Sequence, residues 1–310
     1  MVTSISHKVG AVVVTYHPDS DLAERMRSLS AQVAHVVVVD NGSTDATLAP
    51  LAVLADDHPL SLLRNATNLG IAAALNQGVS ALRRRGATWA LLLDQDSEPA
   101  SDMVAKLLTT ATQPRSHPIA QVAPNVRDRG LPEGTRRWLS LTPRHLFGFT
   151  RIRCNNDVIE NVIAVTSGSM INLAILDDIG GFDERLFIDF VDTDYCLRAA
   201  AGGYATIVNC RALLLHSVGA KQARRLFGLK FIPTFHSPLR RYYLFRNRVH
   251  MIRQHARRWP HWLTYETAAT IHTLLGILLF ENDKAHQFRA CALGTWDGLM
   301  GRCGQTWRSF

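Results

Sequence analysis

The stretch WALLLDQDSEP, residues 89–99, decides the fold class of this chain. Four apolar residues, 90–93, run directly into two carboxylates, Asp94 and Asp96, that are separated by one residue. A short apolar run that ends in turn-forming residues is typical of a strand buried on both faces. Two carboxylates directly after a buried strand require an explanation, and the neighbouring segments provide it.

The same pattern occurs three times before this stretch. Apolar runs followed by polar residues lie at 9–14, 36–39 and 60–63, and segments with helical spacing lie at 21–33, 47–54 and 71–85. This alternation predicts an α/β fold, with a mostly parallel central sheet flanked by helices. Ligands of such sheets bind beyond the carboxyl ends of the strands, so the polar residues there are candidates for a site. They are Thr15, Tyr16, Asp40, Asn41, Ser43, Asn68, Gly70, Asp94, Gln95 and Asp96.

The carboxylates Asp94 and Asp96 have the spacing of a cation site. On an extended segment both can bind one hard cation, or one can hold the metal while the other orients a ribose. The chain has no G-x-x-x-x-G-K-[ST] and no G-x-G-x-x-G after its first strand, so those two phosphate-binding loops are excluded. The alternative is a capped turn, because Ser97, Glu98 and Pro99 are also turn residues.

A second acidic cluster lies at 183–194, where a helix is predicted over 189–203. On that helix Asp189 and Asp192 are i, i+3 neighbours and share a face. Neighbouring carboxylates raise one another's pKa, which prepares one of them to act as a general base. The alternative is an acidic helix N-terminus that the helix dipole stabilises.

The charge of the chain is concentrated in one interval. The 310 residues carry a net charge of +8, but the interval 195–265 holds 13 Lys and Arg and no acid, which leaves −5 for the rest (8 minus 13). A basic block of this kind indicates an anionic partner: a phosphate, a membrane surface or a nucleic acid. The alternative is a solvated helix face. Residues 239–310 are predicted to be helical with a break near Pro260, and the uncharged segment 267–280 is too short for a comfortable membrane span, which favours a buried or interfacial helix.

The cysteines predict a reducing compartment. Five cysteines at wide spacings, without a C-x-x-C pair, argue against a disulfide framework or a zinc site. The N-terminal segment has no signal-peptide pattern, which also favours the cytosol.

Taken together, these segments resemble glycosyltransferase family 2, the inverting nucleotide-sugar transferases of the type-A fold. The matching pieces are VVVTYHPD (12–19), VVVVDNGSTDAT (36–47), NATNLGIAAALNQG (65–78), WALLLDQDSEP (89–99), SGSMI (167–171), GGFDERLFIDFVDTDYCLRA (180–199), HSVG (216–219) and RRYYLFRNRV (240–249). LDQDS and LFIDFVDTDYCLR are similar to the rhamnosyltransferase branch, whose donor is dTDP-L-rhamnose.

The resemblance implies a role for each matching residue. Asp192 is the implied catalytic base, although Val191 stands where the family has the first acid of a Glu-Asp pair. Asp96 and His216 are the implied ligands of Mg²⁺ or Mn²⁺. The implied donor contacts are Thr15, Tyr16, Asp40, Asn41, Ser43, Asn68, Gly70, Asp94, Gln95 and Arg246. The implied acceptor or sugar contacts are Asp189, Ser167, Gly168 and Trp138.

The resemblance also implies a reaction. A sugar, L-rhamnose from dTDP-L-rhamnose, is transferred with inversion to a saccharide acceptor on a polyprenyl diphosphate, in cell-surface polysaccharide or O-antigen synthesis. The expected protein is cytoplasmic and peripheral at the inner face of the membrane. The expected domains are a catalytic domain, 1–238, divided into a nucleotide-binding part, 1–112, and an acceptor and base part, 113–238, followed by a basic helical region, 239–310.

Four alternatives stay open. One is a transferase of the same family with another nucleotide sugar. The others are a nucleic-acid-binding protein that uses residues 195–265, a nucleotidyltransferase on a related sheet, and a sugar-nucleotide sensor without catalysis.

Overall fold

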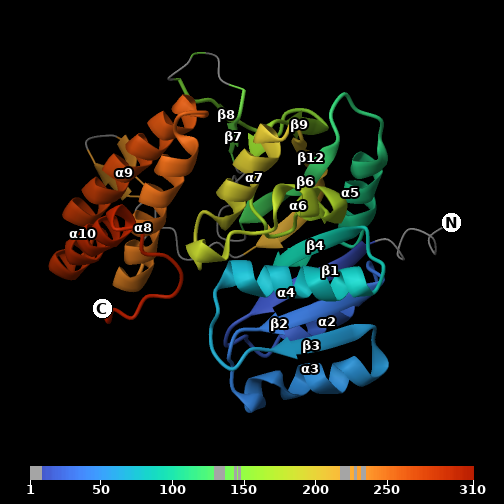
Figure 1. Ribbon diagram of the computed structural model, residues 1–310. Coiled ribbons are helices and arrows are strands. Elements are labelled where there is room, and N and C mark those ends of the chain that lie inside the picture. The colour runs from blue at the N-terminus through green and yellow to red at the C-terminus, as the bar shows by residue number, and fades with distance from the viewer. Residues whose placement is uncertain are drawn as a thin grey trace. The chain divides into compact units, whose positions relative to one another are not determined.

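The computed structural model describes residues 9–128, 137–142, 145, 148–216, 224–226, 229–231 and 235–310, without the side chains at 128, 216, 224–226 and 229–231. The chain forms two compact units (Figure 1). The first consists of Met1–Ser140, Arg151–Glu184 and Val191–Ser217, and the second of Leu141–Thr150, Arg185–Phe190 and Val218–Phe310. The second unit therefore contains the predicted helical region and also takes two short segments from earlier in the chain.

The first unit is built on one large sheet. Its described strands are β1 (Val9–Thr15), β2 (His35–Asp40), β3 (Leu60–Arg64), β4 (Trp89–Asp94), β5 (Glu98–Pro99), β6 (Ile119–Asp128), β9 (Val158–Glu160), β11 (Met170–Asn172) and β12 (Ala205–His216). They lie in the order β3-β2-β1-β4-β11-β6-β12-β5, and β9 pairs with β12. Strands β3, β2, β1 and β4 are parallel, and so are β6 and β12, whereas β11 is antiparallel to both of its neighbours. The predicted mostly parallel sheet is confirmed.

Helices cover both faces of this sheet. They are α2 (Leu22–Ser30), α3 (Asp45–Asp57), α4 (Ile71–Arg84), α5 (Met103–Thr112), α6 (Leu173–Ile179) and α7 (Val191–Ala201). Alternate residues of β1 point to opposite faces. Val9, Ala11 and Val13 belong to the core that α2 and α5 cover. On the other face α4 approaches so closely that a Cβ on its Gly78 would lie 2.3 Å from the Val12 side chain. Burial on both faces explains why these strands are uniformly apolar.

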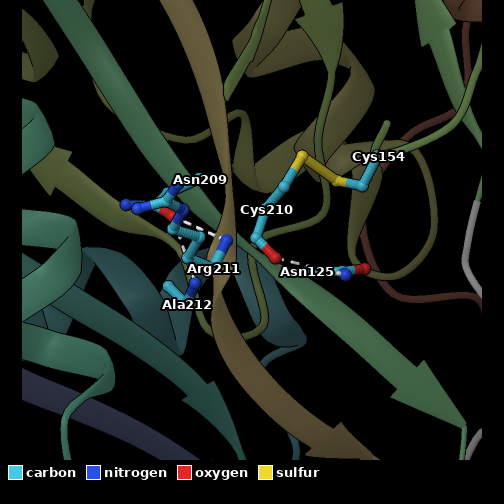
Figure 2. Close-up of a disulfide and its surroundings, with 6 residues drawn as sticks. All are labelled: Asn125, Cys154, Asn209, Cys210, Arg211 and Ala212. Carbon is cyan, nitrogen blue, oxygen red and sulfur yellow. Dashed lines mark hydrogen bonds between the residues drawn. A yellow bond between two sulfur atoms is a disulfide. The ribbon is translucent and has the colours of Figure 1, made fainter. Parts of the chain in front are cut away.

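Strand β12 is one long strand that contains a bulge. Its pairing with β6 has a register shift between Asn209 and Leu213. The Asn209 side-chain oxygen accepts hydrogen bonds from the backbone N–H of Arg211 (2.8 Å) and Ala212 (3.1 Å), which organises this bulge (Figure 2).

A small separate sheet, β10-β7-β8, contains β7 (Trp138–Ser140), β8 (Arg151–Ile152) and β10 (Val162–Ile163).

A disulfide beside the bulge contradicts the cysteine prediction. Cys154 and Cys210 are bonded, although 56 residues separate them (Figure 2). Pairing of β9 with β12 and a hydrogen bond from the Cys210 N–H to the Asp157 oxygen bring the two cysteines together. Sequence spacing missed this because the sheet register, not the chain, sets their proximity. Cys196 and Cys291 are buried free thiols, and burial raises their pKa values to about 12 and about 11.

The second unit is mainly a bundle of three helices. They are α8 (Pro238–His255), α9 (Pro260–Phe280) and α10 (Lys284–Leu299), and a hairpin is formed by β13 (Arg224–Leu226) and β14 (Leu229–Phe231). The predicted break at Pro260 is confirmed. Two glycines let α10 pack closely on α8, because a Cβ on Gly294 or Gly298 would lie 2.3 or 2.7 Å from a backbone oxygen of α8.

The basic block does not form one continuous charged face. Among the described side chains, at least seven of these cations bind other groups of the protein: Arg198, Arg211, Arg240, Arg241, Arg246, Arg248 and Arg253. Arg241 pairs with Glu281 and Arg248 with Glu266, and all four side chains are buried. The partner acids lie outside the interval 195–265. The positive charge that this interval can offer to an anion is therefore smaller than its count of Lys and Arg suggests.

Helix α9 is longer than the apolar segment 267–280 suggested. It spans 21 residues, and among the described helices it is the one long and apolar enough to cross a membrane by length and composition, with a mean hydropathy of 1.3. Only 17% of its most apolar window is buried. The helix includes Glu266, whose charge is neutralised by Arg248.

Candidate active site at the strand ends

Four strands end side by side at one edge of the first unit's sheet. The register pairs Thr15 of β1 with Asp40 of β2, and Asp40 with Arg64 of β3. Asp94 of β4 lies opposite Val14 of β1. The sheet therefore brings the predicted polar residues to one rim, at the carboxyl ends where α/β sheets bind ligands. This rim, made of residues 15–19, 40–45, 65–70 and 94–97, is called the strand-end rim below.

Asp40 organises the strand-end rim. Its carboxylate is fully buried and accepts hydrogen bonds from the Thr15 hydroxyl (2.9 Å), the Ser43 hydroxyl (2.5 Å) and the N–H groups of Gly42 (3.0 Å) and Ser43 (2.8 Å). Four donors satisfy a buried carboxylate. Asp40, Thr15 and Ser43 thus fix the turn after β2, and a nucleotide would reach Asp40 only after one of these bonds exchanges.

Asn41 joins the ends of β2 and β3. Its amide donates to the Gly70 oxygen (3.2 Å) and accepts from the Asn65 amide (2.9 Å). The Asn68 side chain accepts from the N–H of Gly70 (2.9 Å), which has φ +89°. Glycine adopts this conformation without strain, so Asn68 and Gly70 form a defined turn into α4.

The Asp94-Gln95-Asp96 turn is held from two sides. The Gln95 side-chain oxygen accepts from the Tyr16 N–H (2.8 Å), and its backbone oxygen accepts from the Arg25 guanidinium (2.9 Å). The side chains of Asp94, Gln95 and Asp96 are half-buried, and Tyr16 is 49% exposed. The turn is therefore held in place at Gln95, and the side chains of all three residues are partly exposed. No local sequence pattern indicates this role for Arg25, because its partner Gln95 lies 70 residues later in the chain.

Ser167 and Gly168 lie beneath this turn. The Ser167 hydroxyl accepts from the Asp94 N–H (3.2 Å) and lies 2.7 Å from the Ser97 hydroxyl. Gly168 has φ +80° and donates to the Leu92 oxygen (2.7 Å). Both residues are buried, so their position supports the turn after β4. Trp138 is only 1% exposed and packs in the main core.

Asp192 lies in the first turn of α7, but Asp189 does not share its helix. The helix begins at Val191, and Asp189 has φ +62°. The predicted i, i+3 neighbours are therefore wrong as helical partners. Asp189 instead pairs with Arg240 of α8 (2.9 Å) within the second unit. Asp192 is half-buried and accepts a hydrogen bond from the Thr193 N–H (2.7 Å).

The last two predicted site residues are Arg246 and His216. Arg246 is 2% exposed, and its guanidinium donates to the backbone oxygens of Gly304, Arg185 and Leu186. Those bonds occupy it inside the second unit, which argues against the donor contact expected for it. The side chain of His216 lies outside the described residues.

The described residues contain no cluster of three or more His, Cys, Asp or Glu that could enclose a metal ion. Mg²⁺ and Mn²⁺ do not need such a cage, because one or two carboxylates and the phosphates of a substrate complete their coordination. Asp94 and Asp96 supply half-buried carboxylates on a fixed turn at the strand-end rim. This donor set fits a hard divalent cation.

Comparisons with known proteins decide the family. The family model for "Glycosyl transferase family 2" matches residues 11–180, more than half of the chain. The chain belongs to glycosyltransferase family 2. It is also similar to the "dTDP-rhamnosyl transferase RfbF" of Shigella flexneri, with 30% identity over 97% of this chain and 98% of that protein. The family resemblance inferred from the motifs is confirmed, and the protein is a glycosyltransferase.

A second relative and two solved structures agree with this family. An N-acetylglucosaminyl-diphospho-decaprenol L-rhamnosyltransferase of Mycobacterium tuberculosis is 26% identical over 66% of this chain and 74% of its own length. The mannosyltransferase PcManGT of Pyrobaculum calidifontis, solved with GDP-Man and Mn²⁺, has a TM-score of 0.58 over 94% of this chain and 87% of that chain, at 18% identity. TarS of S. aureus (residues 1–349) has a TM-score of 0.51 over 95% of this chain and 72% of that chain, at 16% identity. These two structures support the type-A fold of this family 2 enzyme.

Proposed function

We propose that this enzyme transfers L-rhamnose from dTDP-L-rhamnose, with inversion, to a saccharide carried on a polyprenyl diphosphate, in cell-surface polysaccharide or O-antigen synthesis. The observation that carries the proposal is the 30% identity with the Shigella dTDP-rhamnosyl transferase. That match extends past residue 180, where the family model ends, and so includes α7 and the second unit. The relative from Mycobacterium, named for a decaprenol-linked acceptor, supports the lipid-linked acceptor.

The strand-end rim is the proposed donor site. Its accessible groups are Tyr16, Asn68, Asp94 and Gln95, while Thr15, Asp40, Asn41, Ser43 and Gly70 hold them in place. Asp96 and His216 are the proposed ligands of Mg²⁺ or Mn²⁺, and the bound ion would neutralise charge on the donor diphosphate. Asp96 is suited to this because the turn around Gln95 is fixed by Tyr16 and Arg25.

Asp192 is the proposed catalytic base. Its carboxylate removes the proton from an acceptor hydroxyl, and that oxygen forms a bond to the anomeric carbon as the bond to the dTDP oxygen breaks. Attack from the face opposite the leaving group inverts the anomeric centre. The Thr193 N–H donates to one oxygen of this carboxylate (2.7 Å), which orients it in the first turn of α7.

Replacement of the base tests the mechanism. Asp192→Asn should lower transfer by about 10³-fold, because the amide cannot accept the proton, while the dissociation constant of dTDP-L-rhamnose stays within about twofold. A radiolabelled-sugar assay and calorimetry measure the two quantities. Asp178→Asn is the matched control, because Asp178 is an exposed acid of the first unit that accepts a hydrogen bond from the Tyr204 hydroxyl. Turnover near the wild-type value in Asp192→Asn would remove Asp192 from the mechanism.

The donor is tested by a panel of nucleotide sugars with Mn²⁺. We expect dTDP-L-rhamnose to give the largest thermal shift and the highest rate of donor hydrolysis. A clear preference for a UDP- or GDP-sugar would favour the alternative, a family 2 transferase with another donor.

The second unit has features of a membrane-binding surface. The outward face of α9 carries Ile271, Leu275, Leu278 and Leu279, which are 43–54% exposed. Helix α9 has no Lys or Arg, but exposed cations stand at both of its ends: Arg257 and Arg258 before it, and Lys284 after it. An apolar face between cations is typical of a helix that lies in the interface of an anionic membrane. We propose that α9 holds the enzyme, peripherally, at the inner face of the cytoplasmic membrane.

Liposome sedimentation tests this surface. The protein should sediment with anionic vesicles and be partly released at high salt, and Ile271→Ser with Leu278→Ser should weaken binding at least tenfold. Val53→Ser is the control, since Val53 is an exposed apolar residue (68%) of α3 in the first unit. Equal sedimentation of all variants would contradict the proposal. A change of oligomeric state in the α9 variant alone would also contradict it, because it would show that this face binds a second copy of the chain.

A further inference from the structure

The segment Arg185–Phe190, which leads directly into α7, has an unusual backbone. Three of its residues, Phe187, Asp189 and Phe190, have positive φ angles of 61°, 62° and 66°. Residues with a Cβ rarely adopt this conformation, and an aromatic residue in it is an outlier. Such a backbone persists only where surrounding contacts hold it.

Two neighbouring side chains of α8 hold the segment from one side. The Asn247 amide donates to the backbone oxygens of Leu186 (2.7 Å), Ile188 (2.6 Å) and Asp189 (3.4 Å). The Arg246 guanidinium donates to the oxygens of Arg185 and Leu186, both at 3.2 Å. The two side chains also fix each other, since the Asn247 oxygen accepts from Arg246 (2.8 and 3.0 Å).

The C-terminal tail also bonds to this segment and to Arg246. The N–H of Gly304 donates to the Arg185 oxygen (2.7 Å), and its own oxygen accepts from Arg246. The tail is tied to the bundle by Thr306, whose N–H donates to the Tyr243 hydroxyl (2.9 Å). The Tyr243 ring stacks on Phe187 with centroids 4.9 Å apart. The segment is therefore enclosed by groups from α8 and from a tail more than 110 residues later in the chain.

We propose that Arg246, Asn247 and the tail around Gly304 are positioning residues for the transfer reaction. They hold 185–190 in its strained form and so fix the point at which α7 begins. The proposed base Asp192 lies two residues after this segment, so a change in the backbone of 185–190 reaches the first turn of its helix directly along the chain. A base must lie within hydrogen-bond reach of the acceptor hydroxyl, and a displacement of about 1 Å can lower the rate about 10²-fold. This inference rests on the proposed role of Asp192.

The same network gives Arg246 and Asn247 of the sequence YYLFRN, residues 242–247, a role in the reaction although both side chains are buried. Arg246 binds three backbone oxygens in two separate segments, 185–186 and Gly304. Lysine has a single ammonium and could not reproduce this geometry.

Kinetics of two variants test the inference. Asn247→Ala removes the amide NH2 group that makes all three contacts, and Arg246→Lys keeps the charge without the planar fork. Each should lower kcat for transfer at least tenfold, while the dissociation constant of dTDP-L-rhamnose changes less than about twofold. If Asn247→Ala does not fold, Asn247→Asp, which keeps the shape and loses the donors, takes its place.

Glu281→Gln is the matched control for a purely structural effect. Glu281 is a buried residue of the same unit, and its carboxylate pairs with Arg241 rather than with the segment 185–190. It should lower thermal stability and leave kcat near the wild-type value at a temperature where all variants are folded. A kcat for Asn247→Ala as high as that of Glu281→Gln would overturn the inference, and so would an equal loss of donor affinity. Failure of the base itself is recognised separately, by an active Asp192→Asn.

Discussion

The strand-end rim and the helical second unit use charge in opposite ways. At the rim the acids Asp94 and Asp96 stand half-buried on a fixed turn, where a ligand can reach them. In the second unit the pairs Arg241–Glu281 and Arg248–Glu266 are buried and neutralise each other. A partly exposed charge at a surface can bind a ligand, whereas a buried ion pair contributes to the specificity of the fold. A substitution at the rim should therefore change activity and spare stability, and a substitution in the bundle should do the reverse.

The largest effect on stability is expected from breaking a buried pair. Glu281→Gln leaves the Arg241 charge buried without its carboxylate, which should reduce the free energy of unfolding by about 3–5 kcal/mol. Urea unfolding measures it. Asp283→Asn is the control at the same helix connection, since its exposed pair with His286 should contribute less than about 1 kcal/mol. Similar midpoints for the two variants would show that the buried pair does not stabilise the bundle.

The rim should show the opposite behaviour. Asp96→Asn should lower transfer about 10²- to 10³-fold, or about 3–4 kcal/mol in the barrier, because the proposed metal loses a charged ligand. Its melting temperature should match that of the wild type within a degree or two. The matched control is Asp102→Asn, whose exposed carboxylate pairs with Lys106. An active Asp96→Asn enzyme, or one that is inactive because it is unfolded, would break the contrast between the two regions.

The strands and the rim could be predicted from the sequence because their signals are local. Each apolar run is followed by its own polar turn, so Asp40, Asn68 and Asp94 were placed correctly at strand ends without knowledge of the fold. Helix α4 was predicted over 71–85 and spans 71–84. Parallel pairing then requires these ends to meet at one edge.

What the sequence could not predict depends on contacts between distant segments. Asp189 was expected on the helix of Asp192, but Asn247, 58 residues later, holds it in a conformation that no helix contains. Arg241 was counted as part of a basic surface, because its partner Glu281 lies 40 residues away. The disulfide was missed for the same reason, since the register of β9 on β12 brings its cysteines together.

The disulfide sharpens the comparison within the first unit. Cys154→Ser should reduce the free energy of unfolding by about 2–4 kcal/mol, because the bond closes a loop across 56 residues. It should leave transfer unchanged, since no rim residue bonds either cysteine among the described contacts. Cys303→Ser is the control, because that thiol is exposed and free. Denaturation under oxidising conditions makes the measurement, and equal stability of the two variants would contradict the bond.

The smallest effect depends on pH. Hydrogen bonds from Arg308, Tyr242 and Arg302 lower the pKa of Asp297 from 3.8 to about 2. A carboxyl group whose pKa is lower in the folded state stabilises the fold at pH values above its unfolded-state pKa. For Asp297 this contribution to the free energy of unfolding is about 2 kcal/mol, and it is lost as the pH falls from about 4 to 2. Asp297→Asn should flatten the stability profile in that window, as followed by urea unfolding. An unchanged slope would assign the acid sensitivity to other carboxylates.

The position of a bound Mn²⁺ tests the proposed donor site most directly. Crystals grown with dTDP and Mn²⁺ give an anomalous signal that locates the ion. We predict one peak at about 2.0–2.4 Å from a carboxylate oxygen of Asp96, shared with the diphosphate of dTDP over the ends of β1 and β4. A diphosphate bound away from the strand-end rim, or an Mn²⁺ that Asp96 does not touch, would contradict it.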